Sequence, residues 1–274
     1  MGGARRRRFL TFQGLTPNRP GLTPRTESTC KTGRMTHVDL GGAAAAGGSK
    51  TLRGYLATPA GEGPFPAVVM IHEAFGLTDQ IRRHADRLAA AGYLTLAVDL
   101  FSDGGPRRCL VGTMKSMITG EGRVFADIAA ARSWLQASPL STGRTGVIGF
   151  CMGGGFALLA ANDGFDAASV NYGRLPRDLE PALRGACPVV ANYGAKDRTL
   201  RGAAARLESA LDAVGVEHDV KEFPTAGHSF LNDQEEGPRA LRPLTRVMGI
   251  GPDPAAAPEA WRRIEDHFAK HLKT

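Results

Sequence analysis

Short continuous runs of apolar residues recur along the chain and are separated by turns and polar stretches. The run AVVMIH, at residues 67–72, is typical of a strand that is buried on both faces of a sheet. Further strands of this kind are predicted at residues 93–98, 145–150, 167–171, 187–193 and 218–223. Residues 52–58 alternate between apolar and polar positions, which predicts an edge strand.

Amphipathic stretches lie between these runs. In residues 78–91, Ile81, Ala85 and Leu88 follow the spacing of a helix, which Gly92 ends. Further helices are predicted over residues 122–136, 153–161, 203–214 and 259–272. Buried strands that alternate with helices predict a doubly wound α/β fold, in which helices cover both faces of a mostly parallel sheet. Functional residues of such folds lie on loops at the carboxyl ends of the strands.

Composition and length favour one globular domain over residues 35–274. The chain has 274 residues, of which 42% are hydrophobic and 22% charged, enough to bury a sizeable core. No apolar run approaches the roughly 18 residues that a membrane-spanning helix needs. The sequence therefore predicts neither a membrane protein nor a fibrous one.

Residues 1–34 differ from the rest and are predicted to be a disordered basic tail. They contain eight basic residues and one acidic residue, so they carry the whole net charge of +7, and residues 35–274 are neutral. The segment FLTFQGL is too short and too polar for a signal peptide. A transit peptide fits the composition loosely, and Met35 is an alternative start of translation. A neutral body gives no reason to expect nucleic acid as a partner.

The four cysteines (Cys30, Cys109, Cys151 and Cys187) are scattered and show no short paired spacing. This pattern predicts a protein of a reducing compartment, hence a cytoplasmic one, with neither a disulfide scaffold nor a metal site. We also expect no organic cofactor.

The segment from Gly149 to Gly155 (GFCMGGG) follows the predicted strand 145–150 and precedes a predicted helix. G-x-C-x-G in this context is a nucleophile elbow, with Cys151 as the nucleophile. The turn is so sharp that side chains at Gly149 and Gly153 would collide, and the helix N-terminus lowers the pKa of a thiol and offers N–H groups to an oxyanion. The alternative is that Cys151 only packs and the glycines allow close contact between helix and strand.

Two further loops supply partners for Cys151. Asp197 follows the strand 187–193, and His228 lies on the loop after the strand 218–223. The order Cys, Asp, His is the chain order of the α/β-hydrolase triad. His72 is the other histidine at a strand end. The remaining ones fall in tails, helices or charged strand surfaces, where solvated roles are expected: His37, His84, His218, His267 and His271.

From about Gly54 to Leu272, the chain resembles the dienelactone hydrolase family of α/β-hydrolases. The matching segments are HEAFG at 72–76, VDLF at 98–101, GFCMGG at 149–154, Tyr172-Gly173, the Asp197 loop and GHSF at 227–230. The resemblance implies that the Glu73 carboxylate holds the resting Cys151 thiol and is displaced when substrate enters. It also implies that the backbone N–H groups of Ala74 and Met152 form the oxyanion hole. The alternative for Glu73 is a solvated carboxylate on a loop.

The sequence departs from this family at one position. Well-known members carry an arginine four residues after the histidine, which holds a substrate carboxylate, and here that residue is Asn232. Arg107 and Arg108, on the loop after the strand 93–98, are candidates for an anion contact or are plain surface residues. Tyr172 is a further candidate for substrate binding. The long segment 233–258, rich in Pro and Gly, has no predicted role.

The predicted function is hydrolysis of small carboxylic esters or lactones through a thioester on Cys151, with His228 as the base that Asp197 orients. A thiolate is also a good leaving group, so activated acyl groups such as enol lactones suit it best. Two other classes remain open. A non-catalytic or redox-sensing thiol protein would use the same Cys151 without His228, and nucleic-acid binding would rest on Arg5–Arg8 alone.

Overall fold

The computed structural model describes residues 35–235 and 249–274. The predictions for the tail, residues 1–34, and for much of the segment 233–258 therefore lie outside the described residues. Within them, eight strands form one sheet in the order β1-β2-β4-β3-β5-β6-β7-β8. The strands are β1 (Met35–Asp39), β2 (Arg53–Ala57), β3 (Phe65–Ile71), β4 (Leu94–Asp99), β5 (Ser141–Phe150), β6 (Ala167–Asn171), β7 (Val189–Gly194) and β8 (His218–Phe223).

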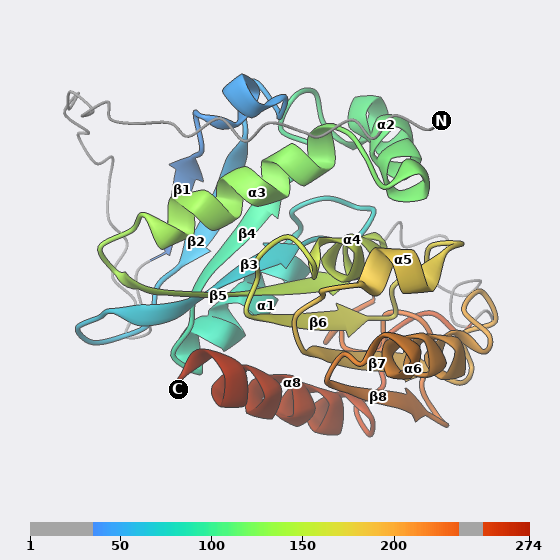
Figure 1. Cartoon of the computed structure of the whole chain (residues 1–274). Helices are drawn as coiled ribbons and strands as arrows, with labels where there is room; N and C mark the ends of the chain where they lie inside the picture. The colour runs from blue at the N-terminus through green and yellow to red at the C-terminus, as the bar shows by residue number, and fades with distance from the viewer. Residues whose placement is uncertain (1–34, 236–248) are drawn as a thin grey trace, which may run out of the picture.

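Helices connect the strands and pack on both faces of the sheet (Figure 1). They are α1 (Asp79–Ala90), α2 (Pro106–Thr119), α3 (Arg123–Gln136), α4 (Met152–Ala160), α5 (Leu179–Leu183), α6 (Ala203–Val214) and α8 (Ala257–Leu272), with a 3₁₀ turn, η1, at Ala43–Ala46. The strands from β4 to β8 in the sheet order run parallel, whereas β1 and β2 are antiparallel to their neighbours. The predicted doubly wound, mostly parallel α/β fold is confirmed.

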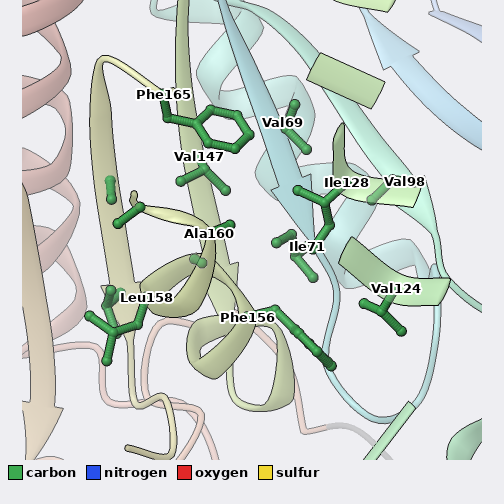
Figure 2. Packing of buried hydrophobic residues seen from close by; sticks show 14 of the residues in the cluster. Val69, Ile71, Val98, Val124, Ile128, Val147, Phe156, Leu158, Ala160 and Phe165 are labelled. Atoms are coloured by element: carbon green, nitrogen blue, oxygen red, sulfur yellow. The ribbon is translucent and has the colours of Figure 1, made fainter. Parts of the chain in front are cut away.

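Alternation along the central strands divides the core into two layers. In β3, Val69 and Ile71 belong to one hydrophobic cluster, while Val68 and Met70 belong to the other. This follows from the period of two in a strand, which sends successive side chains to opposite faces. The first layer packs against α2 to α6, and the second against α1 and α8. Figure 2 shows part of the first layer, where residues of β3 and β5 lie beside residues of α3 and α4. Both faces of the strand are thus buried, as its continuous apolar run requires.

The predicted strand at residues 52–58 is confirmed, but its predicted position at the edge of the sheet is wrong. The strand is β2, which pairs with β1 on one side and with β4 on the other. The short segment MTHVD of β1 is polar and was not predicted as a strand. It covers β2 and takes the edge position itself. The 3₁₀ turn η1 lies between β1 and β2.

Helices α2 and α5 were also not predicted. Apolar residues of α2 are not confined to one face: Cys109 and Met117 are buried, but Val111 and Ile118 are 78% and 72% exposed. Such a helix has no clear amphipathic period, so its sequence pattern does not reveal it. Helix α5 has five residues, which is too short for a pattern to emerge. Among the described residues, no helix combines the length and the apolar character that crossing a membrane would require.

Candidate active site

Cys151 lies at a sharp turn between β5 and α4, at the carboxyl edge of the sheet. Its φ is 53°, in the left-handed region that residues other than glycine seldom adopt. The Cys151 N–H donates to the carbonyl of Asn171, 3.0 Å away at the end of β6. Cys151 directly precedes Met152, the first residue of α4, and it is partly exposed. The structure therefore has the elbow geometry that the sequence predicted.

Gly149 and Gly153 are required by close backbone contacts at this turn. A Cβ atom at Gly149 would lie 1.9 Å from the carbonyl oxygen of Gly153. At Gly153, it would lie 2.2 Å from the carbonyl oxygen of Ile71, the last residue of β3. Both distances are well below van der Waals contact, so any side chain here would push α4 away from the sheet.

Asp197 and His228 form a short hydrogen bond. His228 Nδ1 is 2.5 Å from Asp197 Oδ2, and the other carboxylate oxygen accepts from the N–H and hydroxyl of Thr199 at 2.9 and 2.6 Å. Asp197 is 2% exposed. Burial acts to raise the pKa of Asp197, but the hydrogen bonds from His228 and Thr199 outweigh it and lower the pKa below its usual range. Asp197 is therefore an ionised, fixed acceptor.

Cys151 is the other group that acts on His228, and its interaction with the imidazole contributes to a raised pKa of His228. Asp197 engages Nδ1, which leaves Nε2 available for the thiol. Burial disfavours the imidazolium, but the hydrogen bonds and the negative charges of Asp197 and Cys151 raise the pKa of His228 to about 10. The structure thus brings together the three residues predicted from separate loops, and it favours a protonated His228 beside the sulfur.

The loop that carries His228 is braced by the segment just before α8. His228 N–H donates to Gly249 O at 2.8 Å, and Gly251 N–H donates to His228 O at 2.9 Å. A Cβ atom at Gly227 would lie 1.7 Å from Gly249 O. The described end of the long segment 233–258 therefore fixes the histidine loop, a role that the sequence did not suggest.

Strained backbone is concentrated around this site. In the described residues, the non-glycine residues with positive φ are Cys151, Tyr172 (41°) and Ser229 (59°). Tyr172 is fully buried, and its ring centroid lies 5.2 Å from that of His228. Conformations of this kind cost roughly 1–3 kcal/mol each and are found preferentially at functional sites. Tyr172, predicted to bind substrate, thus contacts the proposed base.

Glu73 is a buried carboxylate, 2% exposed, and not a solvated one. The hydroxyl of Ser229 donates to Glu73 Oε1 at 3.1 Å, and the side-chain amide of Asn232 donates to Oε2 at 3.3 Å. Both donors lie on the loop that carries His228. Glu73 is therefore fixed next to this loop by two side chains, one of which occupies the position of the family's arginine.

The backbone around the predicted oxyanion hole is ordered by His72. Its Nδ1 lies 2.6 Å from the carbonyl oxygen of Glu73, and its Nε2 accepts from Leu100 N–H at 3.1 Å. Burial lowers the pKa of His72, so the neutral ring donates through Nδ1. The carbonyl of Glu73 and the N–H of Ala74 belong to the same trans peptide and point to opposite sides. The hydrogen bond from His72 to Glu73 O therefore also fixes the direction of the Ala74 N–H.

The second predicted oxyanion donor, Met152 N–H, opens α4. The first N–H groups of a helix have no partner within the helix, and they lie at the positive end of its dipole. Ala74 follows β3, and Met152 follows β5, which pairs with β3. Gly153, the residue after Met152, packs against the end of β3, so the two proposed donors lie at the ends of neighbouring strands.

A ladder of buried amides supports the elbow and was missed by sequence reasoning. Asn171 Nδ2 donates to Gly149 O at 3.2 Å, and Asn192 Nδ2 donates to Asn171 Oδ1 at 2.9 Å. Arg263 of α8 donates in turn to Asn192 Oδ1. Two asparagines near the ends of adjacent buried strands are the signal that would have indicated it, because a buried amide requires partners.

Arg107 and Arg108 are placed differently from the prediction. They lie on the first turn of helix α2 and not on a loop, and both are exposed. Arg108 lines a surface cavity of about 610 Å³ together with Lys50, Asp103 and Arg123. Lys50, Asp103 and Arg123 are not among the residues that contact Glu73 or His228. The role of Arg107 and Arg108 in substrate binding therefore stays a prediction.

The prediction of a solvated role for His84 is wrong. The residue is 4% exposed and lies on the buried face of α1. Its ring stacks on Phe150, the residue before Cys151, with centroids 4.6 Å apart and an interplanar angle of 25°. Because amphipathic spacing marked Ile81, Ala85 and Leu88 as the inner face, His84 one position before Ala85 could have been included.

This fold, with a nucleophile elbow at the end of a central strand, defines an α/β-hydrolase. The family model for the dienelactone hydrolase family matches residues 52–272. A Methylorubrum extorquens protein named "Putative carboxymethylenebutenolidase" is 30% identical over 237 residues, which cover 79% of this chain and 76% of that protein. The chain belongs to the dienelactone hydrolase family, and it is a hydrolase.

Solved structures agree in fold. A dienelactone hydrolase-like promiscuous phosphotriesterase from metagenomic libraries superposes with a TM-score of 0.69 at 23% identity, covering 87% of this chain and 99% of the other. Dienelactone hydrolase from Anabaena variabilis gives a TM-score of 0.61 at 22% identity, with 88% and 99% covered. At these identities, the likeness concerns the fold.

Proposed function

We propose that this chain hydrolyses small carboxylic esters or lactones through a thioester on Cys151. The observation that carries the proposal is the short hydrogen bond from Asp197 to His228, together with the interaction of His228 with Cys151, at the carboxyl ends of the parallel strands. A buried carboxylate that orients an imidazole beside a nucleophile is the arrangement that acyl transfer requires.

The reaction begins when the Cys151 thiol gives its proton to His228, and the resulting thiolate attacks the carbonyl carbon while the carbonyl electron pair moves to oxygen. The N–H groups of Ala74 and Met152 donate to this oxyanion. When the carbonyl reforms, the C–O bond to the alcohol breaks, and the His228 imidazolium gives its proton to the departing alkoxide. In a lactone, the alcohol stays part of the same acyl group.

Acylation prepares the second step. The thioester sulfur carries no charge, so His228 loses one of the interactions that keep its pKa high, and it becomes a neutral base. It then takes a proton from water as the water attacks the thioester. Collapse of the second tetrahedral intermediate releases the carboxylic acid and restores the ion pair of Cys151 and His228. Glu73, by resemblance to the family, competes for the thiol before substrate arrives.

The proposed substrates have a neutral acyl part. Asn232 replaces the arginine that would hold a carboxylate, and its amide is already engaged by Glu73 and His84. Activated esters and enol lactones suit a thiolate nucleophile best. We also propose a reducing, cytoplasmic location, because Cys109, Cys151 and Cys187 are free thiols.

A panel of p-nitrophenyl esters, simple lactones and dienelactones tests this proposal. Cys151→Ala is expected to abolish turnover and to retain the melting temperature of the wild type, and Cys151→Ser to retain little activity. Mass spectrometry after a rapid acid quench should find the acyl group on the peptide with Cys151. Cys187→Ala is a matched control, since burial raises the pKa of Cys187 to about 12 and leaves its thiol protonated.

Full turnover by Cys151→Ala would overturn the proposed mechanism. Stoichiometric labelling of Cys151 by iodoacetamide without hydrolysis of any ester would instead favour a redox-sensing or non-catalytic thiol protein.

A further inference from the structure

His84 takes part in a buried polar chain that leads to Glu73. His84 Nε2 lies 3.2 Å from Asn232 Oδ1, and Asn232 Nδ2 donates to Glu73 Oε2. All three side chains are almost completely buried, with 4%, 3% and 2% exposed. The chain therefore connects helix α1 to the carboxylate next to the His228 loop, in a region where an unpaired polar atom is costly.

The direction of each hydrogen bond follows from the carboxylate. Both oxygens of Glu73 accept, one from Ser229 and one from the Asn232 amide nitrogen, so Asn232 presents its oxygen to His84. His84 Nε2 must then carry the proton. Burial lowers the pKa of His84 to about 4, with the bond to Asn232 acting against it, so the ring is neutral at physiological pH. A neutral ring has one proton, and this geometry assigns it to Nε2.

The His84 ring is itself held from several sides. It lies between Phe150, at the end of β5, and Trp261 of α8, whose ring centroid is 4.9 Å away. Gln80 Nε2, one turn earlier in α1, lies 3.4 Å from the same nitrogen. Because Arg83 donates to the Gln80 oxygen, both nitrogens carry hydrogen, so this approach is a packing contact and not a hydrogen bond.

We propose that His84 is a positioning residue for the hydrolysis proposed above: its Nε2–H fixes the orientation of the Asn232 amide, and that amide holds the Glu73 carboxylate beside the His228 loop. The inference rests on the proposed function and adds a residue that touches no substrate. Without the donor, the Asn232 amide is free to rotate, and Glu73 loses a fixed partner.

His84→Phe tests the donor while it retains an aromatic ring between Phe150 and Trp261. Because the change acts through Glu73, its effects should resemble those of Glu73→Gln but be smaller. We expect kcat to fall about 3- to 10-fold, the effect of losing one neutral hydrogen bond. We also expect iodoacetamide to alkylate Cys151 faster, by a factor in the same range, because the competing carboxylate is less well held.

Three further variants separate positioning from packing. His84→Gln keeps a donor and loses the ring, and it should restore most of the kcat and the alkylation rate even if its melting temperature is lower. In a Glu73→Gln background, His84→Phe should leave the alkylation rate unchanged. His267→Phe is the matched control: His267 is a half-buried histidine whose pKa is also lowered by burial to about 4, and its Nε2 lies 3.2 Å from Pro188 O, before β7. It should change neither kcat nor alkylation.

The proposal is overturned if kcat and the alkylation rate change across the variants only in proportion to their melting temperatures. In that case the kcat of His84→Gln would be lower than that of His84→Phe. It is also overturned if His84→Phe acts equally with Glu73 and with Gln at position 73. Alkylation of Cys151 requires no ester, so the coupling of His84 to the thiol remains measurable even if the wild type hydrolyses nothing. Failure of this inference is thus distinguishable from failure of the proposed function.

Discussion

Asp197→Asn removes the negative charge from the 2.5 Å hydrogen bond with His228 and leaves the shape of the side chain almost unchanged. The carboxylate is 2% exposed, so solvent does not screen its interaction with the imidazolium. The amide can still accept from Thr199 through its oxygen. The substitution therefore tests the charge of Asp197 rather than its volume.

The size of the effect follows from the strength of this bond. Hydrogen bonds to charged groups contribute about 1.5–3 kcal/mol, and a pKa difference of one corresponds to about 1.36 kcal/mol. Loss of the charge should thus lower the pKa of His228 from about 10 to about 8–9. Because the imidazolium stabilises the thiolate, we expect the pH profile of iodoacetamide alkylation to shift to higher pH. We expect kcat/KM for p-nitrophenyl acetate to fall about 10²- to 10⁴-fold.

The same charges make stability depend on pH. The pKa of His228 is raised by folding, so its contribution is complete below about 6.5 and is lost as pH rises toward 10. The pKa of Asp197 is lowered, so its contribution is present above 3.8 and is lost as pH falls further. Urea unfolding should therefore show the largest advantage of the wild type over Asp197→Asn between about pH 4 and 6.5.

Asp166→Asn is a suitable control, since it makes the same change of charge at an ion pair with Arg144 on the surface. It should leave turnover and the alkylation profile unchanged. If Asp197→Asn keeps kcat/KM within about twofold of this control and its alkylation profile does not move, the assignment of Asp197 as the orienting carboxylate is refuted.

Three other changes have defined outcomes. Glu73→Gln should speed alkylation of Cys151 near neutral pH and reduce turnover about 10- to 100-fold, whereas no change in either rate would mean that Glu73 does not compete for the thiol. Deleting residues 1–34 should alter neither melting temperature nor turnover, and a loss of several degrees would show that the segment packs against the body. Gly153→Ala should lower the free energy of unfolding by about 1–3 kcal/mol or more, because its Cβ would lie 2.2 Å from Ile71 O. In the same urea titration, Gly112→Ala, with no heavy atom within 4 Å of its Cβ, should raise it by about 0.5–1 kcal/mol, and equal effects of the two would contradict the packing argument.

Local sequence determined the central strands and the elbow. The central parallel strands contain continuous apolar runs, such as AVVMI in β3 and VVA in β7, because a strand buried on both faces has no polar side to alternate with. The need for glycine at positions 149 and 153 could be predicted because a sharp turn that packs against a strand leaves no room for side chains. Cys151, Asp197 and His228 each follow a predicted strand, which was sufficient to place them on loops at the same end of the sheet, since parallel strands end on the same side.

Tertiary structure alone decided the surroundings of these residues. The polar strand β1, which covers β2, and the brace from Gly249 to His228 depend on backbone pairing between distant segments, which leaves no periodic pattern in the sequence. The spacing of α1 places His84 on the inner face, but its partners Phe150 and Trp261 come from a strand and a helix far along the chain, so only the tertiary structure reveals them. Residue type and spacing identify the groups that react, whereas the contacts that orient them arise only when the sheet and its helices pack together.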